Sequence, residues 1–256
     1  MKQLSLAFTF LAFFFVSHAL QAQQGWKVGG FAQPQFVFLY NADDIELEPE
    51  AYTPEALWGM AGGVVLGYNF NDYFGFRVNG IFSQQGGKYS VIDGINSETN
   101  FTTRLEYFKV PLMIGFNTNP INRKVLFSIY AGMQAGFLTS AFLYNDNPAY
   151  DLLLSEEISR FPTGTELYNS IDYSVVGEVG FDVQLPPDNF TLNLRLRGDY
   201  SIQDVENKEA TFRITEGGNT RNERYWPFFR GLTRNADTFG LTAGLLVGVT
   251  YTFPTY

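Results

Sequence analysis

The sequence contains no cysteine, and its only histidine is His18. Without cysteine the chain has no disulfide, no thiolate metal site, no thiol nucleophile and no lipid attachment site of the lipoprotein type. Because His18 lies in a segment that we expect to be removed, the mature chain has no imidazole to act as a general base or metal ligand. We therefore expect no enzyme activity, no cofactor and no metal.

Positive charge is also scarce. The 17 Lys and Arg residues face 26 Asp and Glu residues, which gives a formal net charge of −9. Binding to a phosphate backbone needs a basic surface. Nucleic acid is therefore not an expected partner.

Long hydrophobic runs are missing after the first 22 residues. Residues 4–16 form an apolar core of about 13 residues, which suits a signal peptide and is too short for a spanning helix. Small residues follow it, so we predict a cleaved signal peptide over residues 1–22, with the cut after Ala19 or Ala22. The mature domain, residues 23–256, is expected to enter the cell envelope without a helical anchor.

What the chain has instead is alternation between apolar and small or polar residues. Residues 237–253 read DTFGLTAGLLVGVTYTF, with the large apolar residues on one parity and glycine or threonine on most of the other. A period of two places these sets on opposite faces of a strand. The run is long enough to cross an outer membrane at a tilt.

Eight such runs follow the signal peptide, and the connections between them alternate between long and short. The runs are 26–40, 58–70, 73–84, 103–117, 125–141, 172–185, 190–203 and 237–253. This rhythm predicts an all-β fold, an eight-stranded antiparallel up-and-down transmembrane β-barrel with short periplasmic turns and long extracellular loops. An even number of strands places both termini in the periplasm.

A soluble barrel of the lipocalin type is the alternative, because its strands also alternate. Strand length counts against it, and so do the aromatic residues near strand ends, which suit the two membrane interfaces. These aromatic residues are Trp26, Tyr40, Trp58, Phe70, Phe74, Phe82 and Tyr173. The expected location is the outer membrane of a Gram-negative bacterium. The expected partners are its lipid and lipopolysaccharide, and the barrel-assembly machinery during insertion.

The same parity turns a set of charged residues toward the barrel interior. This lumen set comprises Lys27, Arg77, Lys109, Glu178, Asp182, Arg195, Arg197 and Asp199. Buried charges are tolerated when they are paired and hydrogen-bonded. We predict that the three carboxylates pair across the lumen with the cations other than Lys27 and fill the barrel. A proton or ion path is the alternative.

Two loops carry unusual composition. The first long loop is acidic and could bind Ca²⁺ through Asp43, Asp44, Glu46, Glu48, Glu50 and Glu55, although a solvated acidic loop explains it as well. The last long loop mixes arginine with aromatic residues, as a contact surface for a protein or for lipopolysaccharide phosphates does. That candidate surface is Arg221, Arg224, Tyr225, Trp226, Phe228, Phe229, Arg230 and Arg234. The alternative is an extension of the outer aromatic girdle.

Glycine-rich residues 84–89, QQGGKY, lack the spacing and the Ser or Thr of a phosphate loop, and we interpret them as a strand end that turns into a loop. Pro111 cannot donate a ladder hydrogen bond, so we expect a bulge within a residue or two of it.

Residues 107–116, YFKVPLMIGF, resemble the Y-x-x-[IV]-P-L-[LM] segment of the PorT-like outer-membrane β-barrel proteins of Bacteroidetes. Residues 82–89, 130–132 and 177–182 fit the same resemblance, which covers nearly all of the mature chain. It implies an accessory barrel of type IX secretion. Two alternatives stay open: a surface adhesin or ligand-binding barrel that acts through its long loops, and a narrow, porin-like pore. Barrel proteases and lipid A deacylases or acyltransferases depend on a histidine, which the mature chain does not have.

Overall fold

The computed structural model describes residues 25–43, 52–92, 98–118, 124–145, 167–186, 189–209, 211–216, 219–224 and 236–253. The strands in this part of the chain are β1 (Gly25–Asn41), β2 (Tyr52–Glu55), β3 (Leu57–Asn69), β4 (Phe74–Ile92), β5 (Glu98–Asn117), β6 (Val125–Asn145), β7 (Ile171–Leu185), β8 (Phe190–Ser201), β9 (Thr211–Glu216), β10 (Asn219–Arg224) and β11 (Thr238–Thr252).

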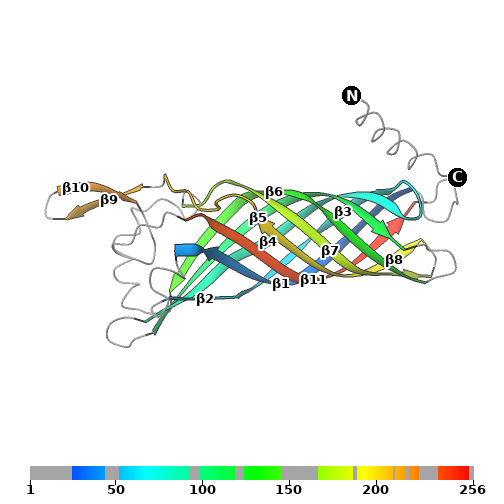
Figure 1. The fold of residues 1–256 in the computed structure, drawn as a ribbon, viewed down its shortest axis with the longest axis horizontal. Coiled ribbons are helices and arrows are strands. Elements are labelled where there is room, and N and C mark those ends of the chain that lie inside the picture. Colours follow the sequence, from blue (N-terminus) through cyan, green and yellow to red (C-terminus); the bar gives the residue numbers. More distant parts are fainter. Residues whose placement is uncertain are drawn as a thin grey trace, which may run out of the picture.

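Eight long strands form a closed antiparallel barrel (Figure 1). Strand β1 pairs with β3 on one side and with β11 on the other, and the β4–β5 pairing completes the circuit. The expected eight-stranded barrel is therefore confirmed. Because Lys27 is paired with Thr252, β1 begins and β11 ends at the same end of the barrel. Each of the eight long strands pairs with a neighbouring strand on both sides, as a spanning barrel requires.

The wall carries its apolar side chains on the outside. Phe82 and Ile114 are each 69% exposed, and Val64 and Leu196 are nearly as exposed. Aromatic rings cluster at the strand ends, for example Trp26 against Tyr68 and Phe36 against Trp58, with centroids 5.2 and 5.1 Å apart. Such a surface is stable only in an apolar solvent. Within the described ranges, no helix combines the length and the apolar character that a membrane crossing needs.

Three strands are longer than the sequence pattern predicted. Strand β4 runs to Ile92, β5 begins at Glu98 and β6 ends at Asn145, so most of the loop expected at 85–102 is strand. The interpretation of QQGGKY as a turn into a loop was wrong. Gly86 takes a φ of 138°, and a Cβ there would lie 1.9 Å from the carbonyl oxygen of Thr103, so glycine lets the strand continue through a tight contact.

Further strands lie in segments that we expected to be loops. Strand β2 pairs with the outer part of β4, and the Lys88 ammonium lies 2.8 Å from a carboxylate oxygen of Glu55. Strands β9 and β10 form a separate two-stranded hairpin, which projects well beyond the barrel at the end opposite the start of β1 (Figure 1).

The bulge expected beside Pro111 is not there. The register between β5 and β6 shifts at Glu106 and Tyr107 instead, and leaves Thr139 without a paired residue. On its other side, β5 keeps one register with β4, but the pairs between Val78↔Leu112 and Ile81↔Lys109 are missing. Proline removes a donor without adding a residue, so it breaks the ladder locally and leaves the register unchanged.

Candidate functional site

The barrel lumen is filled with charged side chains, and Glu178 of β7 lies at their centre. One carboxylate oxygen is 3.2 Å from Nη1 of Arg77 on β4 and 3.6 Å from Nη1 of Arg195 on β8. The other oxygen accepts a hydrogen bond of 2.9 Å from Arg197. The Glu178 side chain has no exposed surface. One carboxylate thus contacts three guanidinium groups from two different strands.

A second carboxylate extends this network toward the end where β1 begins. Asp182 forms an ion pair with Arg195 and accepts a hydrogen bond of 2.8 Å from Asn193. Arg195 also donates from Nε to the Ser128 hydroxyl at 3.0 Å. These additional hydrogen bonds satisfy the polar atoms that the ion pair leaves, which is the condition for burying charge.

Tyr130 of β6 lies beneath two of these cations. The guanidinium carbon of Arg77 is 3.4 Å from the ring centroid, and that of Arg195 is 5.0 Å away, so both make cation–π contacts. The Tyr130 hydroxyl is 3.1 Å from Oδ1 of Asn117. The ring lies over Gly115, where a Cβ would be 2.0 Å from it. Sequence reasoning missed this tyrosine, although its inward parity and the opposing glycine could have indicated it.

Nearer the opposite end, Lys109 of β5 pairs with Asp199 of β8. The ammonium lies 2.6 Å from Oδ2, and the Thr242 hydroxyl donates to Oδ1 at 2.7 Å. Gln85 also donates to Oδ2, at 3.3 Å. Lys109 is 1% exposed, so this pair is buried from solvent like the Glu178 network.

The structure therefore brings together seven of the eight predicted lumen residues. Lys27 also points inward near the start of β1, but it is half-buried and makes no ion pair with a described residue. No group of three or more His, Cys, Asp or Glu side chains in the described part of the chain could hold a metal ion.

The predicted loop residues lie mostly outside the described ranges. Asp44, Glu46, Glu48 and Glu50 of the acidic loop are among these, as are Tyr225, Trp226, Phe228, Phe229, Arg230 and Arg234. Arg221 and Arg224 lie on β10. Asp43 closes the described part of the first loop, and its carboxylate accepts a hydrogen bond of 2.9 Å from the backbone of Ala236.

Buried apolar side chains cluster at the end of the lumen opposite the start of β1, the outer mouth. Leu39, Leu105 and Tyr107 of the wall pack against Tyr168 and Val205. The last two come from the segments 167–170 and 202–209, which are joined by the Tyr168↔Glu206 bridge and by a backbone hydrogen bond of 2.9 Å from Asn169 to Val205. These two segments therefore pack against wall residues at this end of the barrel.

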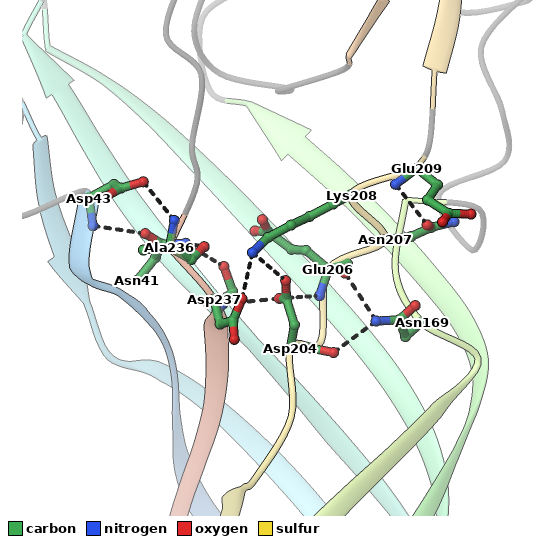
Figure 2. Close-up of polar contacts among 11 residues, drawn as sticks. Asn41, Asp43, Asn169, Asp204, Glu206, Asn207, Lys208, Glu209, Ala236 and Asp237 are labelled. Carbon is green, nitrogen blue, oxygen red and sulfur yellow. Dashed lines mark hydrogen bonds and ion pairs between the residues drawn. The ribbon is translucent and has the colours of Figure 1, made fainter.

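A set of polar contacts, the mouth clasp, holds these segments to β1 and β11 (Figure 2). It is formed by Asn41, Asp43, Asn169, Asp204, Glu206, Lys208, Ala236 and Asp237. Lys208 bridges Asp204 at 3.0 Å and Asp237 at 2.5 Å. Partial burial lowers the pKa of Lys208, but the hydrogen bonds to Asp237 and Asp204 outweigh it and raise the pKa above 10.5.

A cavity of about 390 Å³ lies on the wall rather than in the lumen. Its outward-facing lining includes Met60, Phe82, Gln84, Glu106 and Thr139, next to the register shift of β6. This cavity opens toward the membrane side of the wall. It does not enclose a ligand as a small-molecule site does.

The chain is similar to one family model and to several solved structures. Residues 21–207 match the family model described as "Outer membrane protein beta-barrel domain". Among solved structures, the outer membrane protein OprG of Pseudomonas aeruginosa is 11% identical with a TM-score of 0.46, over 92% of this chain and 99% of that chain. Neisserial surface protein A is 12% identical with a TM-score of 0.43, over 90% and 97%. No curated protein matches the chain.

Proposed function

The chain belongs to the family of outer membrane protein beta-barrel domains, and from this premise we propose that it is a closed, non-enzymatic barrel that anchors a loop-side contact surface at the cell exterior. The main support for this proposal is that the lumen is filled with side chains. Charged side chains from β4, β5, β7 and β8 meet across it, and the segments at the outer mouth cover it. A barrel filled in this way acts as an anchor and not as a channel.

The direction of the barrel in the membrane is part of the proposal. The connections at the end where β1 begins are short, since β3 and β4 are joined by residues 70–73 and β7 and β8 by residues 186–189. At the other end β4 and β5 are joined by residues 93–97, but the other three connections are long, and two of them carry β2 and the β9–β10 hairpin. Outer-membrane barrels place short turns in the periplasm. The start of β1 and the end of β11 would then be periplasmic.

Single-channel recording in a planar bilayer tests the closed lumen. The refolded protein should insert without steady conductance, and a gel-mobility shift on heating should confirm that the inserted protein is folded. A stable, high single-channel conductance would overturn the anchor and favour a narrow pore.

For the partner, we propose a component of protein export of the type IX kind. Support comes from the resemblance of residues 107–116 and from the arginine and aromatic residues between 221 and 234. Deleting the gene in the bacterium that encodes it, followed by comparison of released and surface proteins, tests this role. Loss of exported proteins that is restored by the wild-type gene supports it. An unchanged set of exported proteins contradicts it.

A variant separates the loop surface from the barrel. Replacing Arg221, Arg224, Arg230 and Arg234 with alanine should abolish crosslinking to an export component while the barrel still shifts on heating. Crosslinking at the wild-type level would exclude these arginines as the contact.

A surface adhesin is the second candidate, and the projecting β9–β10 hairpin favours it (Figure 1). Removing residues 211–224 should then abolish attachment to a glycan or host protein and leave export unchanged. Retained attachment would remove this candidate.

A further inference from the structure

Asp172 of β7 is a buried carboxylate that forms no ion pair within the described part of the chain. It is 1% exposed, like the other lumen carboxylates. Glu178, Asp182 and Asp199 each form an ion pair, whereas Asp172 forms none with any described residue. An isolated buried carboxylate is strongly unfavourable unless something neutralises it.

Unsatisfied oxygens surround this carboxylate. The Ser174 hydroxyl donates to Oδ2 of Asp172 at 2.8 Å, but Oδ1 has no hydrogen-bond partner among the described residues. The hydroxyl oxygens of Tyr107 and Ser201 are also buried without a hydrogen bond to any described residue, and each of these residues is 1% exposed.

The strand register explains why these oxygens converge. Ser201 lies directly opposite Ser174, two residues along β7 from Asp172 and on the same face. Asp172 is itself paired with Gly136, which is paired with Lys109 on its other side. A Cβ on Gly136 would lie 3.3 Å from the Tyr107 ring and 3.6 Å from the Asp172 carbonyl oxygen. The missing side chain leaves room between Tyr107 and Asp172.

Among the described lumen carboxylates, Asp172 is the one that forms no ion pair. Lys109 is the nearest cation on the facing strands, and its ammonium lies 2.6 Å from Asp199. Lys109 is therefore paired with Asp199, while Arg197 is held by Glu178 and Gln134. Tyr107 and Tyr168, which belong to the apolar cluster at the outer mouth, contribute no charge to the surroundings of Asp172.

We propose that Asp172, Tyr107 and Ser201 bind one monovalent alkali cation such as Na⁺. The donors are all oxygens, which hard cations prefer, and a single positive charge would pair with the Asp172 carboxylate. The apolar cluster at the outer mouth covers this level of the lumen, so the cation would be enclosed when the barrel folds. The inference concerns the stability of the barrel and does not depend on the proposed partner or on conductance.

Urea unfolding of the full-length protein in lipid vesicles tests it, with sodium chloride compared with N-methylglucamine chloride at equal ionic strength. Because only the folded state holds the ion, the folding equilibrium constant should rise about tenfold for each tenfold rise in sodium above the dissociation constant. Asp172→Asn should remove this dependence and should fold at least as well without sodium. Asp182→Asn, which breaks an arginine pair, should lose stability but keep the dependence on sodium.

Ser201→Ala gives a second measurement that does not change the charge. It should shift the sodium response to higher concentration. A wild type with equal stability in both salts would overturn the proposal and indicate a proton or a water molecule at Asp172. An unchanged sodium response in Asp172→Asn would also overturn it, because the ion would then bind elsewhere.

Discussion

Arg77 on β4 and Glu178 on β7, 101 residues apart in the sequence, meet inside the barrel with 3.2 Å between Nη1 and Oε2. Between β4 and β7 the circuit contains two strands on one side, β5 and β6, and four on the other, β3, β1, β11 and β8. The pair therefore spans the lumen and does not stay within one wall. Because both side chains are dry, the interaction is not screened by salt as a surface pair is.

Replacing Glu178 with glutamine should destabilise the barrel strongly. Arg77, Arg195 and Arg197 would lose their shared carboxylate, and breaking a buried pair costs about 3–5 kcal/mol. Urea unfolding of the refolded protein measures this loss. Glu55→Gln is the matched control, since its pair with Lys88 is partly exposed and should contribute under about 1 kcal/mol. Equal losses in the two variants would contradict a buried network.

Gly115→Ala should displace Tyr130 from its position under Arg77. The added Cβ would lie 2.0 Å from the ring, and such overpacking costs about 1–3 kcal/mol. Gly177→Ala serves as the control, because the nearest atom to its Cβ is 4.0 Å away. The free energy of unfolding should separate the two variants. If both alanine variants matched the wild type, the close packing of Tyr130 on β5 would be wrong.

Leu196→Arg should be costly because this outward side chain is 63% exposed in the middle of the wall. An arginine at the membrane midplane of a barrel costs about 2–4 kcal/mol, and much less near an interface. Ile202→Arg, just beyond the end of β8, is the interfacial comparison. Unfolding in lipid vesicles should show a clear difference between them. Similar values would mean that β8 does not cross the membrane at this depth.

The mouth clasp should weaken at high pH. The pKa of Lys208 is raised above 10.5 in the folded protein, so its contribution is fully present below pH 10.5. That contribution is lost as the pH rises through the folded-state pKa. The difference in unfolding free energy between wild type and Lys208→Met should therefore be constant near neutral pH and shrink in strong alkali. A difference that grows with pH would reverse the assigned sign.

Much of the barrel could be predicted from local pattern. The eight long strands, their outward apolar faces and the inward direction of Glu178, Asp182 and Arg195 follow from alternation. The loop expected at 85–102 was wrong because Gly86 carries β4 onward, and pairing with β5 stabilises a segment whose own residues favour a turn. The bulge expected near Pro111 was wrong because a missing donor and an inserted residue have different effects on a ladder.

The sequence by itself determined which way each strand residue points, since a period of two is a property of the extended backbone alone. Only the tertiary structure decided which charges meet: closure of β1 onto β11 and the stagger between strands bring Glu178 to Arg77, and leave Asp172 among hydroxyl oxygens. It also decided that residues 167–170 turn across the mouth instead of continuing β7 outward. Those outcomes depend on distances across a lumen, which no local pattern records.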